Sequence, residues 1–477
     1  MKFDAARLRL EGPGLRGVAE VKAALELLGA GEVYLVGGAL RDLALGSLSS
    51  RPDLDFALER PDLTLASRVA KALGGSAFVL DEGEGAYRVA WEGGFADLVA
   101  LRAPTIEEDL RKRDFTLNAL ALNLRTGELL DPLGGLAALE KSILIPCSPE
   151  SMKDDPLRAL RAYRFAAAGN FTFSEGTARQ IKNVLPLLKP GSGAVSPERI
   201  RDELFKTFTG SYLKTALKMM EEQGALFALF PFTEKWKGLD QGDYHRFDLL
   251  EHSLRAAGFA RETAESLGEG REWLASHLEE LHEQSITRFS LLVFACLFHD
   301  IGKPSTRTVE HSGRVRFLTH DTQGARLVQK TLSNLRAGKK TARAAERLVA
   351  GHMRLFSLAH QEKPTLRSRM KFLRDLGDET PEAIILSLCD ELATGGEDSA
   401  YTALGRTGEE ILELWLIEKK APQKSGPLLL GRDLLELGIA AGPEVGRILR
   451  AVGEAEAEGE ISTREEALSL VRNIHEN

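Results

Sequence analysis

The first 145 residues alternate between short apolar runs and longer stretches in which apolar and polar residues mix with helical spacing. Apolar, β-rich runs at 33–36, 56–58, 78–80 and 95–101 have the length of strands. Strands that alternate with helices are typical of a layered α/β domain. The pattern therefore predicts an α/β head up to about residue 145.

From Asp155 onward, the apolar residues recur with helical spacing. They form one apolar face at Leu157, Leu160, Ala162, Phe165 and Ala166. Turn-forming clusters at 189–193, 238–242 and 421–427 interrupt this pattern and divide it into segments. We therefore expect the rest of the chain to be α-helical.

A pair of glycines, Gly37 and Gly38, comes after the first apolar run and precedes a helical stretch. Glycine has no Cβ, so the backbone N–H groups of such a turn can approach phosphate oxygens closely. Arg41 is placed to meet a triphosphate. Alone, a Gly-Gly pair is more often just a turn, so its functional interpretation depends on the residues that come after it in the chain.

Two carboxylates come next, at Asp53 and Asp55. Side chains alternate along a strand, so both project from one face and can hold a divalent metal between them. Asp97 lies in a second apolar alternation and can bring a third carboxylate to this site; the alternative is a strand-end acid that faces water. A phosphate cradle followed by paired carboxylates predicts metal-dependent chemistry on a nucleoside triphosphate.

The composition narrows the kind of protein. The 477 residues are 43% hydrophobic and 28% charged, which suits a multidomain globular protein. The net charge of −8 argues against a protein that coats nucleic acid indiscriminately but allows a local basic groove. Cys147, Cys296 and Cys389 are far apart without Cys-x-x-Cys spacing, and no window is as apolar as a membrane span. We expect a cytoplasmic protein without membrane attachment.

Two charged clusters come after the last apolar run of the head. The first combines a cation, an acid and an amide just before an apolar helix: Arg113, Asp114 and Asn118. The second recurs every three residues along one side of a helix: Asp155, Arg158, Arg161 and Arg164. Taken alone, the first fits a capped helix with a charged first turn, and the second fits ion pairs within a solvated helix.

Histidines and carboxylates recur in the helical part in an order that suits a metal centre. They are His252, His299, Asp300, His320, His352 and Asp390. The adjacent His299-Asp300 pair makes this order more specific than a lone histidine, which in an apolar helix is usually a core residue. Imidazole and carboxylate ligands suit a transition metal or magnesium that activates water against a phosphoester.

The glycine pair with the Asp-x-Asp sequence resembles the nucleotidyltransferase superfamily that includes DNA polymerase beta. More narrowly, nearly the whole chain resembles class II of the bacterial tRNA nucleotidyltransferase and poly(A) polymerase family, and the histidine order resembles the HD phosphohydrolase superfamily. The resemblance implies a polymerase-beta-like α/β nucleotidyltransferase head at 1–145 and an all-α neck at 146–237. It further implies a metal-dependent HD domain at 238–400 and a helical, tRNA-binding tail at 401–477.

The resemblance also implies roles for individual residues. In the family, one motif contacts the ribose and phosphates of the incoming nucleotide, and the next hydrogen-bonds its base edge in place of a nucleic-acid template. The first motif corresponds to Arg113, Asp114 and Asn118. The second corresponds to Asp155 and Arg158, with Arg161 and Arg164 on the same side of the helix. The HD ligands would be His252, His299, Asp300 and Asp390, with His320 and His352 for a second metal.

The implied reaction is attack of the 3′ hydroxyl of a tRNA on the α-phosphate of CTP, with Mg²⁺ on Asp53 and Asp55 and pyrophosphate leaving. Gly37, Gly38 and Arg41 would hold the triphosphate. A divalent metal of unspecified identity would bind the HD domain. No membrane and no obligate protein partner is implied.

The path from Asp97 to Asp114 is short. Members of the family that add the terminal A usually carry a flexible, charged loop there, and its loss resembles the CC-adding subgroup. We therefore expect the addition of two CMP residues from CTP. The alternatives are a complete CCA-adding or A-adding enzyme that also uses ATP, a poly(A) polymerase, and an HD phosphohydrolase whose head is a regulatory nucleotide-binding module.

Overall fold

The computed structural model describes residues 16–29, 31–49, 51–242, 244–361, 364–395, 398–420, 428–457, 461 and 463–475. The chain divides into two compact units, Met1–Glu234 and Lys235–Asn477. Of the turn clusters expected from the sequence, 421–427 lies outside the described residues.

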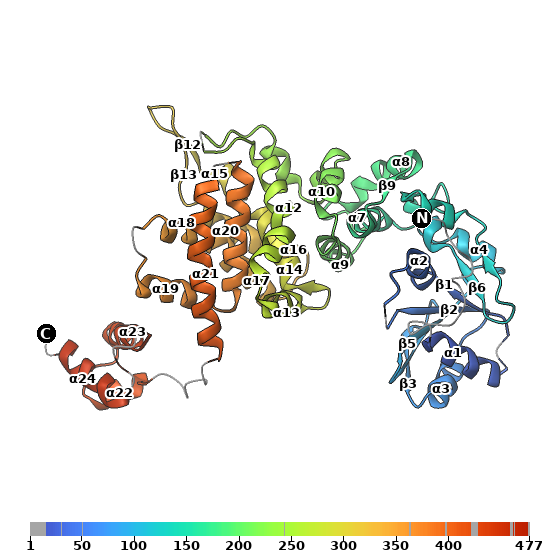
Figure 1. The fold of residues 1–477 in the computed structure, drawn as a ribbon, viewed down its shortest axis with the longest axis horizontal. Helices are drawn as coiled ribbons and strands as arrows, with labels where there is room; N and C mark the ends of the chain where they lie inside the picture. Colours follow the sequence, from blue (N-terminus) through green and yellow to red (C-terminus); the bar gives the residue numbers. More distant parts are fainter. Residues whose placement is uncertain are drawn as a thin grey trace. The chain divides into compact units, whose positions relative to one another are not determined.

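A seven-stranded sheet forms the centre of the first unit, in the order β3-β4-β5-β2-β1-β6-β7 (Figure 1). Its strands are β1 (Val33–Val36), β2 (Leu54–Leu58), β3 (Ser76–Asp81), β4 (Ala86–Trp91), β5 (Gly94–Ala100), β6 (Ala121–Asn123) and β7 (Leu129–Leu130). Strands β2 and β5 are parallel, and the other neighbours are antiparallel. The four predicted strands are confirmed as β1, β2, β3 and β5. The sequence analysis does not single out β4, in which Arg88 separates Ala86-Tyr87 from Val89-Ala90-Trp91, or the short strands β6 and β7.

Helices α1 (Arg16–Leu27) and α3 (Leu63–Ala72) pack on one face of this sheet. That face includes Val89, Ala96 and Leu98, which are fully buried. Because side chains alternate along each strand, the neighbouring residues project from the opposite face. One row on the opposite face consists of residues that pair directly across four strands: Phe78, Arg88, Asp97 and Asp55.

The remainder of the first unit is largely helical. Its helices are α2 (Gly38–Leu45), α4 (Ile106–Arg111), α5 (Gly135–Glu140), α6 (Ser151–Asp154), α7 (Arg158–Gly169), α8 (Glu175–Val184), α9 (Pro197–Phe208), α10 (Leu213–Glu222) and α11 (Ala225–Leu229). Helix α7 packs against α9 and α10. Ser196 caps α9 by accepting a hydrogen bond from the backbone N–H of Arg199, and Pro197 comes next at the first helical position. A short parallel pair, β8 (Ile143–Leu144) with β9 (Thr172–Phe173), is an exception to the expected all-helical neck.

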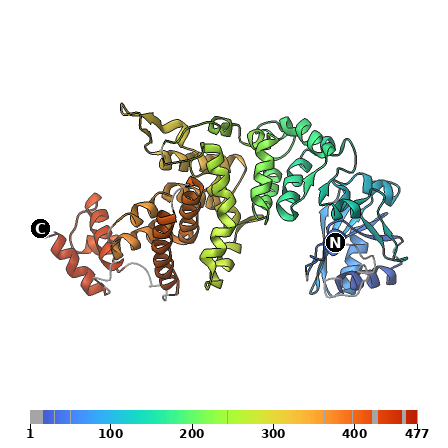
Figure 2. The ribbon, with the colours of Figure 1, turned by 45° about the horizontal axis from the view of Figure 1, so that its top comes forward.

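The second unit is a bundle of helices in which α12, α14 and α20 pack side by side (Figures 1 and 2). Its helices are α12 (Leu249–Gly268), α13 (Glu272–Glu279), α14 (Arg288–Phe298), α15 (Lys303–Thr306), α16 (His320–Asn334), α17 (Lys339–Gly351), α18 (Arg354–Ala359), α19 (Leu366–Leu376), α20 (Thr380–Thr394) and α21 (Asp398–Lys420). The run from Leu291 to Phe298 is buried on every side of α14. A helix that is apolar all round belongs in a core, so α14 is the central helix of this unit.

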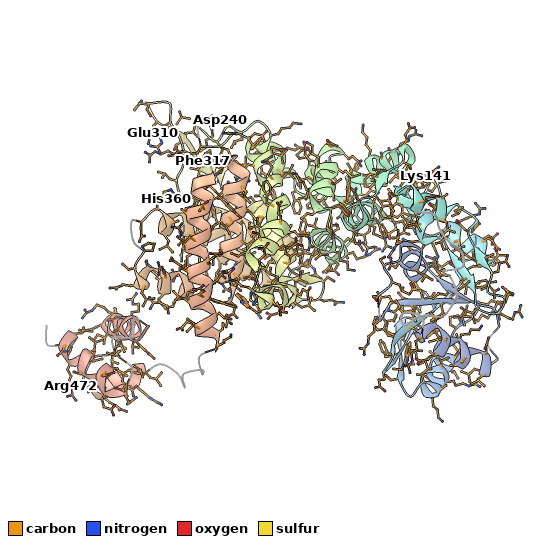
Figure 3. The ribbon with its side chains drawn as sticks, in the orientation of Figure 1. Lys141, Asp240, Glu310, Phe317, His360 and Arg472 are labelled. Atoms are coloured by element: carbon orange, nitrogen blue, oxygen red, sulfur yellow. The ribbon has the colours of Figure 1, made fainter. Side chains whose placement is uncertain are left out.

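Two small antiparallel pairs depart from the wholly helical expectation for this part of the chain. They are β10 (Leu281–Glu283) with β11 (Ile286–Thr287), and β12 (Arg307–Val309) with β13 (Val315–Phe317). Gly313 takes a φ of 85° in the turn between β12 and β13, a conformation that suits glycine. Glu310 lies near this turn, and Phe317 lies at the end of β13 (Figure 3).

The last helices, α22 (Gly431–Glu436), α23 (Pro443–Ala457) and α24 (Arg464–His475), share a small apolar core that includes Leu434, Ile448 and Val471. The expected helical tail is therefore confirmed over its described residues. None of the helices in the described ranges is both long and apolar enough to cross a membrane.

Candidate active site and metal cluster

The glycine turn lies where β1 ends and α2 begins. Gly37 has φ 78° and ψ −137°, a backbone conformation that side chains with a Cβ rarely adopt. A Cβ at this position would lie 3.2 Å from Oδ2 of Asp55 and 3.3 Å from Nη1 of Arg113. Glycine is therefore required both by the turn and by the close approach of a carboxylate and a guanidinium.

Asp55 lies in the middle of the sheet, opposite Val36 on β1 and beside Asp97 on β5. Burial raises the pKa of the Asp55 carboxyl group, and the neighbouring charge of Asp97 raises it further, while Arg113 acts in the opposite direction. A buried carboxylate with like charges nearby is stabilised by a cation. Asp53 and Asp55 line the same cavity, so these residues fit a hard divalent metal ion.

Asp97 makes a different set of contacts. Both of its carboxylate oxygens accept hydrogen bonds from Arg88, at 2.6 Å from Nε and 2.7 Å from Nη2. Asp97 is not among the residues that line the cavity. The structure therefore places it next to Asp55, as expected from the sequence, but pairs it with a guanidinium of the chain itself.

A chain of hydrogen bonds links the helix after the glycine turn to the motif that contains Asp114 and Asn118. Arg41 donates from Nη1 to Oδ1 of Asn118 at 2.8 Å, and Asn118 donates to Oδ1 of Asp114 at 3.0 Å. Burial alone would raise the pKa of the Asp114 carboxyl group, but Arg161 and Asn118 lower it below its usual range. Asp114 is therefore an ionised acceptor inside the protein, oriented by its neighbours.

The arginines on α7 do not pair within their own helix. Arg161 contacts Asp114 at 2.6 Å, and Arg164 contacts Glu203 of α9 at 2.9 Å. Arg158 donates to the backbone carbonyls of Lys112, at 2.8 Å, and Arg113, at 3.2 Å. The explanation by intrahelical ion pairs is therefore wrong, because these side chains connect α7 to the head and to α9.

Asp155 lies just before α7, and its Oδ2 accepts a hydrogen bond from Arg199 at 2.9 Å. Arg199 is also the second residue after Pro197 in α9, so this pair connects two helices of the neck. Asp155 and Arg158, the residues predicted to read the base, therefore lie close together at the start of α7, and each already has a hydrogen-bond partner within the protein.

One cavity of about 610 Å³ brings most of the predicted residues together. Its lining includes Gly37, Gly38, Arg41, Asp53, Asp55, Arg113, Asp114, Asn118, Asp155, Arg158, Arg161 and Arg164. It also includes residues that the sequence analysis does not single out: Ser47, Ser49, Arg51, Arg102 and Arg199. Arg51 precedes the Asp53 pair by two residues, so its position beside the motif is a signal that could have identified it.

A second cluster lies in the other unit. His252 on α12, His299 and Asp300 at the end of α14, and Asp390 on α20 each offer a ligand atom within 4.8 Å of the others, and Asp300, His320 and His352 form a second such group. Both Asp300 and Asp390 are buried. Among the described residues, the three carboxylates of the head do not form a comparable group. All six predicted positions are therefore brought together around Asp300.

Backbone carbonyls fix how the imidazoles face this centre. His299, His320 and His352 donate from Nδ1 to the carbonyl oxygens of Cys296, Phe317 and Val349, at 2.9, 2.7 and 2.6 Å. Each hydrogen bond turns Nε2 toward the cluster, which is the orientation of a metal-ligating histidine. The donor set of imidazole nitrogens and carboxylate oxygens therefore fits a divalent transition metal.

Burial and neighbouring charges shift the pKa values of two histidines of the cluster. Burial alone would lower the pKa of His299, but the carboxylates of Asp300 and Asp390 raise it to about 10. Burial lowers the pKa of His352 to about 4. The carboxylates therefore favour the charged form of His299, whereas burial favours the neutral form of His352.

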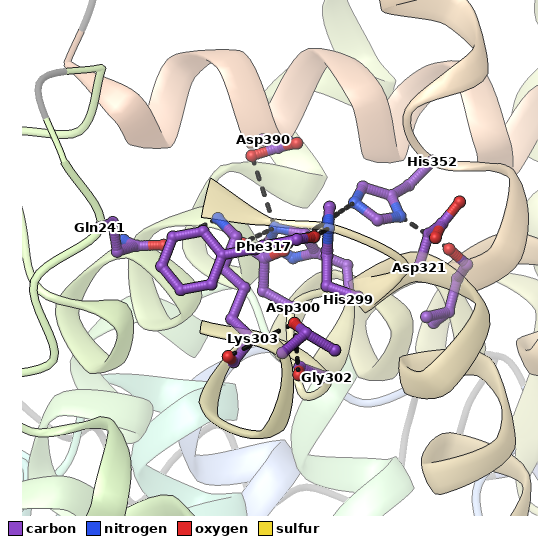
Figure 4. Close-up of polar contacts among 12 residues, drawn as sticks. Gln241, His299, Asp300, Gly302, Lys303, Phe317, Asp321, His352 and Asp390 are labelled. Carbon is purple, nitrogen blue, oxygen red and sulfur yellow. Dashed lines mark hydrogen bonds and ion pairs between the residues drawn. The ribbon is translucent and has the colours of Figure 1, made fainter. Parts of the chain in front are cut away.

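Lys303 is a further member that the sequence analysis leaves without a role. Its Nζ lies 2.6 Å from Oδ2 of Asp300, donates to Gln241 at 2.8 Å, and lies 5.4 Å from the centre of the Phe317 ring (Figure 4). It lies three residues after Asp300, so proximity to the His-Asp pair was a signal for it. A buried ammonium group beside the cluster is suited to hold an anion there.

Three family models match the chain: "Poly A polymerase head domain" at residues 33–145, "Probable RNA and SrmB- binding site of polymerase A" at 170–237, and "HD domain" at 249–395. The chain is 35% identical to an A-adding tRNA nucleotidyltransferase of Deinococcus radiodurans over 449 residues, which is 92% of this chain and 94% of the relative. It is 34% identical to a CC-adding tRNA nucleotidyltransferase of Thermus thermophilus over 445 residues, covering 92% and 93%.

Solved structures show the same fold at lower sequence identity. The Thermotoga maritima CCA-adding enzyme complexed with tRNA matches with a TM-score of 0.58 at 20% identity, covering 99% of both chains. The Bacillus stearothermophilus CCA-adding enzyme in complex with CTP matches with a TM-score of 0.64 at 21% identity, covering 98% of both chains. The head, helical neck, HD domain and helical tail are those expected. From its relatives and its fold, the chain belongs to the tRNA nucleotidyltransferase family, and it is an enzyme with a poly(A) polymerase-type head and an HD domain.

Proposed function

We propose that this enzyme adds two CMP residues from CTP to the 3′ end of tRNA in the cytoplasm. The observation that carries the specificity is the connection between β5, which ends at Ala100, and α4, which begins at Ile106. Only residues 101–105 span it, so the chain lacks the long charged segment that members adding the terminal A usually carry there. The three free cysteines agree with a reducing compartment.

The residues of the cavity can be assigned to parts of the substrate. The turn at Gly37 and Gly38, with Arg41, holds the triphosphate, and Asp114 accepts hydrogen bonds from the ribose hydroxyls. Asp155 and Arg158 offer an acceptor and a fork-shaped donor to the base edge, with Arg161 and Arg164 contributing positive charge. No nucleic-acid template is needed, because the protein supplies the complementary edge.

Asp53 and Asp55 would hold Mg²⁺ in the head, which neutralises the developing charge on the transferred phosphate. The 3′ hydroxyl of the tRNA attacks the α-phosphorus of CTP, a new P–O bond forms, and pyrophosphate leaves with the broken bond's electrons. Arg41 and Arg113 lie where they can stabilise the charge on that leaving group.

Addition of A is the second candidate, because the Deinococcus radiodurans relative is named as A-adding and is as similar to this chain as the CC-adding relative. An HD-domain reaction is an additional candidate. The ligand set around Asp300 supports hydrolysis of a phosphoester, such as a cyclic or terminal phosphate on an RNA end.

The test uses the purified full chain with Mg²⁺ and tRNA transcripts that lack CCA, end in C, or end in CC. Each is given CTP, ATP or both, and the products are sized. We expect two additions from CTP and no addition of A to the CC end. Addition of A to the CC end alone would establish the A-adding alternative, and long A tails would establish a poly(A) polymerase.

The control for the chemistry is Asp55→Asn, which removes a metal-binding oxygen without changing the size of the side chain. We expect it to lower the rate of CMP addition by about 10³-fold or more. Hydrolysis by the HD domain should not change in this variant. If none of the three RNAs is extended by the unaltered protein while phosphoester hydrolysis is present, the hydrolase alternative replaces the proposal.

A further inference from the structure

We propose that Arg88 is a positioning residue that holds Asp97 until a divalent cation takes this carboxylate, and that the released guanidinium then binds a phosphate of the RNA 3′ end. The inference deepens the proposed function and rests on it for the identity of the RNA. It concerns β4, one of the strands that the sequence analysis does not single out.

The contacts show that Arg88 engages both oxygens of Asp97. Its two nitrogens reach both carboxylate oxygens, at 2.6 and 2.7 Å, in the fork geometry that only arginine provides. The Asp97 side chain is 16% exposed and that of Arg88 is 32% exposed. A metal ion that used Asp97 would need the same oxygens, so the metal and the guanidinium compete for them.

Charge explains why the pair exists. Asp97 lies next to Asp55 on the parallel neighbour strand, and its charge contributes to the raised pKa of Asp55. Without a cation, an unpaired Asp97 would repel Asp55 and destabilise the sheet where β2 and β5 pair. Arg88 supplies one positive charge there, and a divalent ion supplies two to the same group of carboxylates.

The open face of the sheet provides a place for the released guanidinium. Arg88 lies over the Phe95 ring, 4.5 Å from its centre, and pairs across the strands with Phe78, which is 45% exposed on the edge strand. Strands are spaced by about 4.8 Å, so Arg88 lies about 10 Å from Asp55 along the row. A cation over one aromatic ring, with an exposed Phe on the neighbouring strand, is suited to a single-stranded RNA end, through its phosphate and its bases.

The exchange predicts opposite effects for its two partners. Arg88→Gln removes the competitor, so the head should bind Mn²⁺ about tenfold more tightly, the equivalent of one charge-assisted hydrogen bond. Asp97→Asn frees Arg88, so an RNA ending in CC should bind severalfold more tightly without metal, while Mn²⁺ binding weakens. In the unaltered protein, Mn²⁺ should tighten RNA binding, and this linkage should disappear in both variants.

Free Mn²⁺ is measured by electron paramagnetic resonance, and RNA binding by fluorescence anisotropy, both without nucleotide. The HD cluster is a second candidate Mn²⁺ site in the same chain. The Mn²⁺ sites that are lost in Asp55→Asn are therefore assigned to the head. Arg88→Lys keeps the positive charge but not the forked geometry, so its Mn²⁺ affinity should lie between those of the unaltered protein and Arg88→Gln. This variant tests the competition even if Arg88→Gln folds poorly. The matched control is Arg125→Gln, which removes an exposed ion pair with Glu32 elsewhere in the head and should change neither measurement.

Unchanged or weaker Mn²⁺ binding in both Arg88 variants would overturn the exchange, as would RNA binding that does not respond to Asp97→Asn. The Mn²⁺ titration needs neither RNA nor CTP. It therefore tests the competition at Asp97 even if the transcripts show that the enzyme does not add CMP, which is the result that would overturn the proposed function.

Discussion

Asp114 and Arg161 show how single residues of the cavity depend on one another. Asp114 is only 7% exposed, and its negative charge is compatible with burial because Arg161 contacts it at 2.6 Å. Arg161 also lies 3.7 Å from Glu203 of α9. The ribose-binding acceptor proposed here is thus part of a network that joins the head to the neck.

Arg161→Gln should therefore destabilise the protein by about 3 kcal/mol at pH 7, because it leaves a buried carboxylate without its cation. The pKa of Asp114 is lowered in the folded protein, so its ionised form stabilises the fold above the usual value of 3.8, and this contribution is lost as the pH falls below it. The destabilisation should shrink below about pH 4. Urea unfolding at both pH values measures the effect.

The exposed pair of Arg125 and Glu32 again gives the control, since Arg125→Gln should change the free energy of unfolding by about 0.5 kcal/mol or less. An equal cost of Arg161→Gln at about pH 3, below the usual pKa of the aspartate carboxyl group, and at pH 7 would show that lost packing, not the ion pair, is responsible.

Helix α15 approaches α16 so closely that only glycine fits between them. A Cβ at Gly302 would lie 2.2 Å from the carbonyl oxygen of His320 and 2.8 Å from the backbone nitrogen of Gly324. This contact brings His320 to the Asp300 side of the metal cluster. The spacing of two helices therefore sets the spacing of the ligands.

Gly302→Ala should separate α15 from α16, cost about 2–3 kcal/mol in the free energy of unfolding and reduce the amount of metal that the second unit retains. Metal content after dialysis and urea unfolding measure the two effects. Gly268→Ala is the matched control, because no atom lies within 4 Å of its Cβ position. Full metal retention in Gly302→Ala would show that the α15–α16 distance does not control the cluster.

The elements also show what sequence patterns can and cannot predict. The glycine turn, Asp55, the Asp114 motif and the helix with Arg158 were predictable, since each is a local spacing that its own strand or helix imposes. The partner of Asp97 was not, because Arg88 reaches Asp97 only through the register of β4 and β5. Arg199 likewise meets Asp155 only because α9 packs against α7.

The whole chain combines two units with different candidate metal ligands. Carboxylates, as in the head, are ligands that Mg²⁺ prefers, whereas imidazoles, as in the second unit, suit a transition metal. Three of the four tryptophans, Trp236, Trp273 and Trp415, belong to the second unit. Tryptophan fluorescence therefore reports mainly on the unfolding of that unit.

Ni²⁺ should raise the midpoint of the fluorescence-detected thermal transition, because at 100 times its dissociation constant a ligand stabilises the folded form by about 2.7 kcal/mol. Mg²⁺ with CTP should affect this transition much less. Asp390→Asn should abolish the response to Ni²⁺ but not CMP addition. A response to Ni²⁺ that survives in Asp390→Asn would place the metal outside the cluster.

Eight arginines line the head cavity, and its described lining contains neither lysine nor histidine. A guanidinium keeps its charge at every pH at which proteins are folded, so acidity does not remove the positive charge of this pocket. The charges that draw in a triphosphate also retain the pyrophosphate that remains after transfer. Turnover at the head would therefore depend on how readily the next triphosphate replaces the bound pyrophosphate.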